Sequence, residues 1–281
     1  YLGQKRSEPY RRMLEQAHSL NRKNVEYSRE LGIALSGTNE KKKAIYHLER
    51  FVQSKEDSNT PEIYLVLGNL YEDIGRYLDT VRHYRRFLKD RPDDAYVHFA
   101  LGYLAYRRTG NFSLARESFK KSLELLPASD ILRRSRANEY LGDMFMKDLE
   151  FDRAAEVYQT TAGYQEQIVS DIRKKIEDVK KIKVEIDAIR ASVDAKDLFQ
   201  GDMFAKVEEK GRLELESREK EYIYGKLNAG KVRWNLAESY ERMGDLPKAI
   251  EFYRKAITYN YRSNGARERI VKLQLKINRG Y

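Results

Sequence analysis

The sequence predicts an all-α protein, in which about five pairs of antiparallel helices stack into a solenoid and one long antiparallel helical hairpin is inserted between two of the pairs. A pattern of about 34 residues recurs along the chain. Only 5 prolines occur, and none lies between residues 128 and 246. This stretch can hold long helices, because an interior proline costs a helix about 3 kcal/mol. Charged residues make up 35% and hydrophobic residues 41% of the chain, a balance that suits helices with one charged face.

The clearest copy of the pattern is 61–94, PEIYLVLGNLYEDIGRYLDTVRHYRRFLKDRPDD. It carries an aromatic residue, a Leu-Gly pair, a second aromatic residue, a small residue, a third aromatic residue and a proline: Tyr64, Leu67, Gly68, Tyr71, Thr80, Tyr84 and Pro92. This order and spacing resembles the tetratricopeptide-repeat (TPR) family, although the family prefers alanine where Thr80 stands. The resemblance implies two helices per repeat and a right-handed superhelix.

Further repeats match this one in register, at 25–58, 95–129, 135–162 and 228–263. The repeat 95–129 has one extra residue, which we place in the turn Arg107–Asn111. In these repeats a small residue on the first helix lets the second helix approach closely, and an aromatic residue on the second helix fills the gap to the next repeat.

The two ends of the chain predict terminal helices. Residues 1–24 predict an N-terminal helix, which fits either the rear half of a preceding repeat or a capping helix. In the first case we expect the protein to continue upstream of Tyr1. Residues 264–281 predict a C-terminal capping helix with a solvent-exposed basic face, as repeat arrays need for solubility.

Between residues 163 and 227 the repeat pattern stops, and a coiled-coil-like helical arm is predicted. Apolar residues here follow heptad-like spacings of three and four, with one three-residue slip: Val169, Ile172, Ile176, Val179, Ile182, Ile186, Ile189 and Val193. A turn is predicted within 193–202, followed by a charged return helix over 203–227 with a less regular face that includes Phe204. The pattern fits an inserted arm that projects about 40 Å, or an overlong helix pair that extends the fourth repeat. We expect part of the outgoing seam to stay uncovered and to offer a surface for a second chain.

Catalytic and metal chemistry find no support in the sequence. It has 0 cysteines, which excludes disulfides, thiolate metal sites and a cysteine nucleophile. Its 4 histidines lie on separate predicted helices without metal-ligand spacing, and neither a glycine-rich phosphate loop nor a nucleophile elbow occurs. We therefore predict no enzymatic activity, no metal and no cofactor. We also predict no membrane span, because no apolar run approaches about 18 residues.

The candidate binding site follows from the resemblance, since the first helices of TPR repeats line a concave groove. Carried over by position, it implies these partner-binding residues: Tyr96, Phe99, Tyr103 and Tyr106 in the repeat 95–129, Leu65 and Asn69 in the repeat before it, and Arg136, Glu139, Asp143 and Met146 in the repeat after it. The rings suit apolar or helical ligand segments, unless they pack within the superhelix, and both interpretations remain open. The carboxylate clamp of TPR chaperone adaptors needs Lys, Asn and Arg at set positions, of which only Asn69 is present.

The predicted function is a non-enzymatic protein–protein interaction scaffold that binds partner segments in the groove and on the arm. The alternative is a polyanion or nucleic-acid-binding adaptor, because the net charge is +10 and residues 228–281 hold 12 basic against 5 acidic residues. No recognised nucleic-acid motif accompanies this charge, and the scaffold is favoured. The basic, Tyr-rich and cysteine-free composition is also similar to the periplasmic TPR scaffolds of spirochaetal flagellar motors, which implies a bacterial periplasmic setting rather than a cytoplasmic one.

Overall fold

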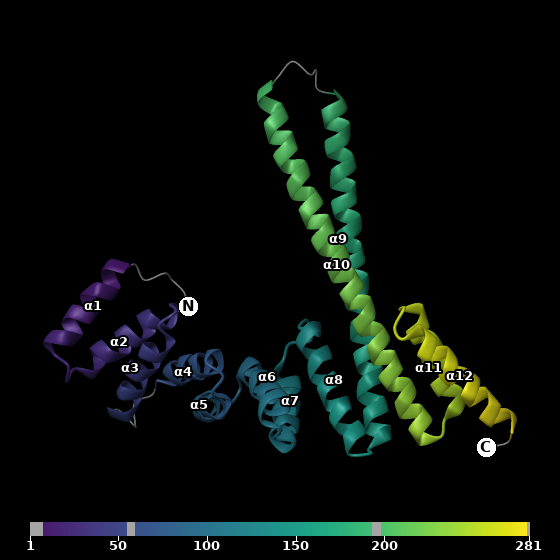
Figure 1. The fold of residues 1–281 in the computed structure, drawn as a ribbon, viewed down its shortest axis with the longest axis horizontal. Helices are drawn as coiled ribbons and strands as arrows, with labels where there is room; N and C mark the ends of the chain where they lie inside the picture. The colour runs from purple at the N-terminus through teal and green to yellow at the C-terminus, as the bar shows by residue number, and fades with distance from the viewer. Residues whose placement is uncertain (1–7, 55–59, 193–197, 280–281) are drawn as a thin grey trace. The chain divides into compact units, whose positions relative to one another are not determined.

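The computed structural model describes residues 8–54, 60–192 and 198–279, and all regular structure within these ranges is helical (Figure 1). The prediction of an all-α protein is therefore confirmed. The chain divides into two compact units, Tyr1–Leu126 (unit 1) and Pro127–Tyr281 (unit 2). Within the described ranges no helix combines the length and the apolar composition that crossing a membrane requires.

Unit 1 has a leading helix followed by helix pairs. The leading helix is α1 (Glu8–Leu20), and the pairs are α2 (Val25–Ser36) with α3 (Lys41–Ser54), α4 (Pro61–Asp73) with α5 (Tyr77–Asp90), and α6 (Ala95–Leu104) with α7 (Phe112–Leu125). These pairs coincide with the repeats that the sequence pattern predicts.

Local capping explains where the helices of the third pair begin. The side chain of Asp94 accepts hydrogen bonds from the backbone N–H groups of Tyr96 and Val97, and that of Asn111 accepts one from the N–H of Leu114. Such side chains satisfy the donors that the first turn of a helix leaves free. Gly110, with a φ of 68°, provides the left-handed turn between α6 and α7, which glycine adopts without steric cost.

The helices of a pair approach most closely where a large side chain lies against a glycine. A Cβ on Gly68 would stand 2.4 Å from the ring of Tyr84, and one on Gly102 would stand 2.8 Å from the ring of Phe119. The close approach therefore depends on the absent side chain. The rings lie over the glycine of their own repeat, and that they also fill the gap to the next repeat stays a prediction.

The extra residue of the repeat 95–129 lies inside a helix and not in a turn. After α6 the chain continues without a break into a π-helical turn, η1 (Ala105–Thr109). A π-helical turn accommodates an additional residue, because its hydrogen bonds span five residues in place of four. The predicted insertion within Arg107–Asn111 is thus corrected to η1, and Tyr106 of the candidate site lies in this widened turn.

Unit 2 is built around two very long helices. Its elements are α8 (Ile131–Lys147), α9 (Phe151–Ser192), α10 (Leu198–Met243), α11 (Leu246–Thr258) and α12 (Ser263–Asn278). The second helix of the fourth repeat runs on into the arm as α9, with 42 residues, and the returning helix runs on into the fifth repeat as α10, with 46 residues. The two lie side by side as an antiparallel hairpin (Figure 1). The two interpretations of the sequence, an inserted arm and an overlong helix pair, therefore describe the same hairpin. The return helix begins at Leu198, and the predicted start at residue 203 was wrong.

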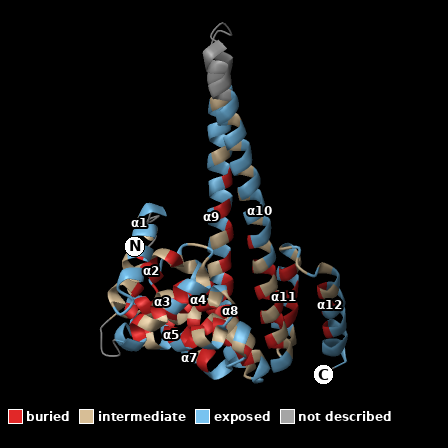
Figure 2. Ribbon diagram, turned by 60° about the vertical axis from the view of Figure 1, so that its left-hand side comes forward, coloured by how far each residue is buried: buried red, intermediate tan, exposed pale blue. Residues whose placement is uncertain are grey.

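Burial along the arm falls from its base towards its tip. Val169, Ile172 and Ile176 are buried near the base, whereas the side chains of Ile182 and Val207 are 55% and 42% exposed. Figure 2 shows the same change, from red and tan at the base to pale blue above it. The predicted seam is thus covered only near the base. The side chains of Ile189 and Phe204 are not described, and Val193 and residues 193–197 of the predicted turn lie outside the described residues. The rest of that predicted turn, 198–202, is the beginning of α10.

The terminal helices pack on their neighbours. In unit 1, α1 lies against α2 and buries Leu14, a contact that fits both the half-repeat and the capping interpretation. In unit 2, α12 lies against α11 and buries Ala266, Ile270 and Leu273. The face of α12 with Val271 and Leu275 stays exposed.

Candidate functional site

The aromatic residues of the candidate site lie on α6 and η1 in unit 1. Tyr96 is 51% exposed, and Phe99, Tyr103 and Tyr106 are half-buried. Successive separations of three, four and three residues place the side chains along one helix face. We call this row of four residues the α6 aromatic face.

Two of these rings also contribute to packing. The ring of Phe99 meets that of Phe119 edge-on, with 5.7 Å between centroids, and the ring of Tyr106 meets that of Phe112 at 5.8 Å. Phe119 itself fills the space over Gly102. Phe99 therefore packs in the core of the pair, as the packing interpretation expects of this ring, and partner binding by the row stays a prediction.

The predicted site residues of α4 lie in the same unit. Leu65 is half-buried, and Asn69 is exposed. The side-chain oxygen of Asn69 accepts a hydrogen bond of 2.7 Å from the hydroxyl of Tyr84, the ring that lies over Gly68. Asn69 thus orients the ring that closes its own pair, and the Lys and Arg that a carboxylate clamp would need beside it were already missing from the sequence.

The predicted site residues of unit 2 lie on α8, and most of them contact α10. Lys231 donates to Glu139 at 2.5 Å, and Ser239 donates to the sulfur of Met146 at 3.2 Å. Asp143 accepts from the hydroxyl of Tyr158 at 2.6 Å. Glu139 is buried, whereas Arg136 is exposed. The first helix of the fifth repeat thus covers the α8 face on which the sequence placed partner-binding residues.

Electrostatics reinforce this contact between α8 and α10. Burial lowers the pKa of Lys231, whereas the hydrogen bond to Glu139 and the negative charges of Glu139 and Asp143 raise it. Because the raising effects are together larger, the pKa lies above its ordinary value. Burial, with the charge of Asp143, likewise raises the pKa of Tyr158. Lys231 therefore stays charged and Tyr158 stays protonated near neutral pH, and both keep their hydrogen bonds.

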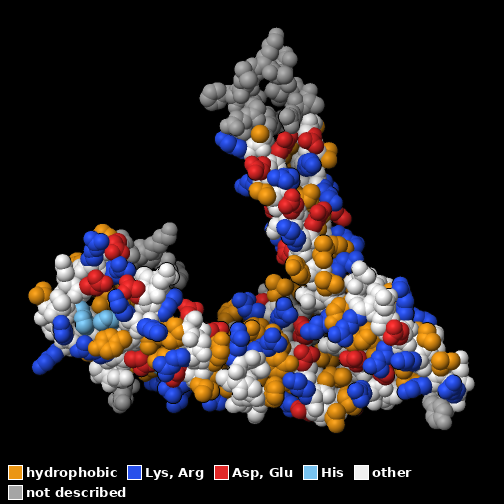
Figure 3. All heavy atoms as spheres, viewed as in Figure 1, with side chains coloured by type: hydrophobic (Ala, Val, Ile, Leu, Met, Phe, Trp, Pro, Cys, Tyr) orange, Lys and Arg blue, Asp and Glu red, His pale blue; other side chains and the backbone are white. Residues whose placement is uncertain are grey.

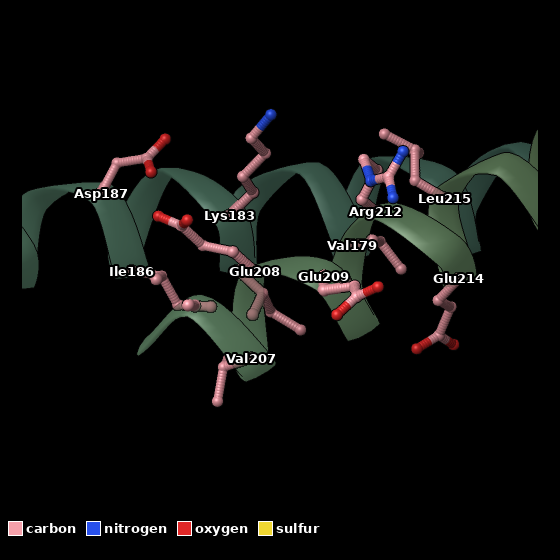
Figure 4. A pocket seen from close by; sticks show the side chains of 13 residues that line it. Val179, Lys183, Ile186, Asp187, Val207, Glu208, Glu209, Arg212, Glu214 and Leu215 are labelled. Atoms are coloured by element: carbon pink, nitrogen blue, oxygen red, sulfur yellow. The ribbon is translucent and has the colours of Figure 1, made fainter. Parts of the chain in front are cut away.

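The arm offers a second candidate surface in unit 2. A hollow of about 690 Å³ lies between α9 and α10 above the buried base. Its apolar lining includes Val179, Ile182, Ile186, Val207 and Leu215. In Figure 4, Val179 and Ile186 point to one side of α9, whereas Lys183 and Asp187 point to the other. Figure 3 shows acidic, basic and hydrophobic side chains together on the described part of the arm. The hollow likewise combines its apolar lining with charged side chains such as Lys183, Glu208 and Arg212.

In the described part of the chain, no group of three or more His, Asp or Glu side chains could hold a metal ion. His18 and His47, which the sequence placed on separate helices, do meet, with ring centroids 4.9 Å apart. Burial lowers the pKa of His47 to about 4, so this ring is neutral near pH 7. The pair joins α1 to α3.

The sequence interpretation missed two features. Arg233 of α10 is 2% exposed, the most deeply buried charge among the described side chains of unit 2. The signal in the sequence was its place among the apolar residues of a first helix, next to Trp234. The second feature is a row of cations on α5, Arg82, Arg85 and Lys89, whose separations of three and four residues already place them on one face.

The comparisons with known proteins agree with this architecture. Residues 65–130 and residues 230–263 match models of the family described as tetratricopeptide repeat. These matches show that the chain contains tetratricopeptide repeats, within an all-α helical solenoid. This fold supports a role as a protein-interaction scaffold.

Solved structures show the same kind of fold. YrrB, described as a TPR protein with an unusual peptide-binding site, is 15% identical with a TM-score of 0.50, over 88% of this chain and 91% of that one. MamA is 21% identical with a TM-score of 0.46, over 56% of this chain and 88% of that one. A tetratricopeptide repeat protein from Parabacteroides merdae is 12% identical with a TM-score of 0.44, over 95% and 91% of the two chains. No curated protein matches the sequence. At these identities the likeness concerns the fold alone.

Proposed function

We propose that the chain is a non-enzymatic scaffold whose α6 aromatic face binds an apolar or helical segment of a protein partner. The observation that carries this proposal is the row of rings from Tyr96 to Tyr106 on one face of a helix whose other face already fills the core with Leu101 and Ala105. Large rings supply contact area at a low cost in conformational entropy, and clustered exposed aromatic residues are typical of interaction surfaces.

The remaining residues of the predicted groove take different parts in this proposal. Leu65 and Asn69 belong to the same unit and would extend the surface along α4. Arg136 is exposed on α8 and pairs with Glu139 at 3.5 Å, so it would meet a partner from within this ion pair. Glu139, Asp143 and Met146 would reach a partner only by giving up bonds within unit 2.

A second partner segment fits the arm. The hollow above its base exposes Ile182 and Val207 between two helices. A helix of a second chain would bury these side chains, and each buried methylene contributes about 0.8 kcal/mol. The arm would thus hold one member of an assembly while the α6 aromatic face holds another.

The setting of the scaffold remains a prediction from composition, as a periplasmic protein associated with flagellar motors. The alternative function, polyanion binding by the basic termini, has less support. Arg262 lies over the ring of Trp234 at 5.3 Å, and Arg269 pairs with Glu241 at 2.9 Å, so part of the C-terminal charge is engaged within unit 2. Oligonucleotide binding that falls steeply with added salt would favour the alternative.

The double variant Tyr96→Ala/Tyr103→Ala is expected to weaken partner binding by about 2 kcal/mol or more, roughly 30-fold, with little change in melting temperature. The partner is first isolated with the full-length protein and identified by mass spectrometry, and the purified pair is then titrated by calorimetry. Phe99 is left intact because its ring packs on Phe119 and its removal would also cost stability.

The matched control is Tyr46→Ala, since Tyr46 is 61% exposed on α3 and lies away from α6. It should bind the partner as the unaltered protein does. Equal losses in the double variant and in the control would show that binding does not depend on the α6 aromatic face.

Shortening the arm is expected to leave unit 2 folded and to abolish binding of the partner that the arm holds. Residues 178–217 are replaced by a short Gly/Ser linker. The base keeps Ile176 and the hydrogen bond of 2.8 Å from Arg173 to the hydroxyl of Tyr222. A deletion that began at Gln165 would instead remove the buried hydrogen bond from its side chain to Ser135.

Circular dichroism and affinity purification of the shortened protein provide the measurement. Helical signal should fall only by the share of the deleted residues, and the melting transition should stay cooperative. A larger loss of helix would show that the body of unit 2 depends on the distal arm, and an unchanged set of partners would remove the arm from the proposed function.

A further inference from the structure

One face of unit 1, to which the second helices α5 and α7 contribute, carries a row of exposed cations beside apolar residues. Leu78, Arg82, Arg85 and Lys89 follow one another on α5 at separations of four, three and four residues, and all are exposed. Such spacing keeps side chains on one face of a helix. This face differs from the α6 aromatic face, because its four residues all lie on α5 and no member of the α6 aromatic face lines the hollows beside it.

A hollow of about 640 Å³ lies along this row. Its charged lining consists of Arg82, Arg85, Arg86 and Lys89, and no carboxylate contributes to it. Its floor includes Val81 and Leu114, both buried, and its edge includes Leu78, which is 73% exposed. The hollow therefore combines positive charge with apolar surface.

Neighbouring carboxylates neutralise only some of these cations. Arg82 pairs with Asp79 at 3.0 Å, and Arg86 pairs with Asp90 at 3.2 Å. Among the described residues no ion pair joins Arg85 or Lys89 to a carboxylate. These two side chains stand one helical turn apart, about 6 Å along the axis.

A second hollow of about 630 Å³ adjoins the first and shares Arg85, Lys89 and Leu114 with it. Its α7 side adds Lys120 and Lys121 together with the carboxylates Glu117 and Glu124. Lys121 pairs with Glu124 at 3.0 Å. The two hollows form a continuous groove between α5 and α7, in which Arg85 and Lys89 occupy the shared middle.

We propose that this groove, which we call the α5–α7 groove, binds an acidic amphipathic segment of a protein partner. Two carboxylates of that segment pair with Arg85 and Lys89, and an apolar side chain next to them rests on Leu78 and Leu114. Charge complementarity selects an acidic segment, since an anion relieves the repulsion among the cations and steers association. Guanidinium groups also bind carboxylates in a bidentate geometry.

The lining argues for protein over nucleic acid. No Phe, Tyr or Trp lines either hollow. The imidazole of His98 lines the second hollow and is bonded to the carbonyl oxygen of Pro92, so bases would find one small ring in place of a row of large rings on which to stack. The exposed Leu78 and the apolar floor would contribute nothing to a phosphate backbone, whereas they match the apolar side chain of an amphipathic segment. This proposal shares with the proposed scaffold function only the assumption that the ligand is a protein.

Three labelled probes test the proposal by fluorescence anisotropy on the full chain at low salt. The first is a twelve-residue peptide of Glu and Leu in helical amphipathic order, the second replaces each Leu by Ser, and the third is a twelve-nucleotide oligothymidylate. The Glu/Leu peptide is expected to bind at least about tenfold more tightly than the other two. Equal or tighter binding of the Glu/Ser peptide or of the oligonucleotide would overturn the proposal in favour of a general polyanion surface.

Charge-reversal variants locate the site. Arg85→Glu/Lys89→Glu should weaken binding of the Glu/Leu peptide by at least about tenfold, whereas Lys23→Glu/Lys42→Glu, with the same change in net charge on exposed residues elsewhere in unit 1, should change it by less than about twofold. Equal weakening in both would reject the groove. Arg85→Gln/Lys89→Gln provides a second test if the reversal impairs folding.

The two surfaces are told apart with the variant Tyr96→Ala/Tyr103→Ala, which should bind the Glu/Leu peptide as the unaltered protein does. If this variant loses the peptide while the Arg85 and Lys89 variants keep it, the α5–α7 groove is wrong and the α6 aromatic face holds the peptide. If the aromatic variant still binds its protein partner while the charge variants no longer bind the peptide, the α5–α7 groove is supported and the proposal for the α6 aromatic face is rejected.

Discussion

Arg233→Ala is expected to lower the free energy of unfolding of unit 2 by about 3 kcal/mol or more. The side chain of Arg233 is 2% exposed. It donates to the carbonyl of Ala229 at 2.9 Å, pairs with Glu166 of α9, and lies over the ring of Tyr259 at 4.3 Å. One side chain thus joins α10 to α9 and to the end of α11.

The parts of this effect differ in size. Glu166 is 63% exposed, so solvent screens the ion pair, which contributes about 0–1 kcal/mol. The larger share comes from the cavity left in the core and from the carbonyl of Ala229, which loses its charged donor. Glu166→Gln should therefore cost less than about 1 kcal/mol, far less than Arg233→Ala.

Urea unfolding followed by tryptophan fluorescence measures this effect in the intact chain. Trp234 is the 1 tryptophan of the sequence and lies in unit 2, so its signal reports on this unit. The control Arg254→Ala removes an exposed arginine from α11 and should shift the midpoint little. A midpoint for Arg233→Ala equal to that of the control would show that Arg233 does not stabilise the junction.

Gly142→Ala is expected to destabilise unit 2 by about 1–3 kcal/mol, although alanine is the better helix former by about 1 kcal/mol. A Cβ on Gly142 would stand 2.6 Å from the ring of Tyr158. That ring is 1% exposed, and its hydroxyl is bonded to Asp143. The ring has no space into which it can retreat, so α8 and α9 must move apart.

The matched control is Gly163→Ala on α9, where a Cβ would meet no other atom within 4 Å. It should raise the free energy of unfolding by up to about 1 kcal/mol, because only helix propensity changes. Opposite shifts of the urea midpoint in the two variants are the expected result. Stabilisation by both substitutions would mean that the ring of Tyr158 leaves room for a Cβ at position 142, so that α8 and α9 need not move apart.

The helix pairs could be predicted because their signals are local. Gly68 and Tyr84 are separated by 16 residues, as are Gly142 and Tyr158, whereas Gly102 and Phe119 are separated by 17. In all three pairs the ring lies over the glycine. The longer separation revealed an extra residue, but only the folded chain showed that a π-helical turn absorbs it. A loop insertion and a π-helical turn leave the same spacing in the sequence.

The candidate site was predictable in part. Periodicity placed Tyr96, Phe99 and Tyr103 on one face, and these residues do share it. The degree of burial depended on α7, which brings Phe119 against Phe99 and leaves Tyr96 exposed. Periodicity identifies the face on which a side chain lies, but the neighbouring helix decides whether that face is covered.

The helical segments, their pairing and their apolar faces could be inferred from the sequence alone, since these depend on residues within one repeat. Which of the faces stay open depends on how the helices pack in the folded chain. Lys231 bonds to Glu139 although 92 residues separate them, because α9 and α10 run unbroken through the arm and bring the fifth repeat back against the fourth. The same long helices bury Ile176 at the base and leave Ile182 exposed. Both outcomes follow from the separation between two helices, which no periodicity along one chain encodes.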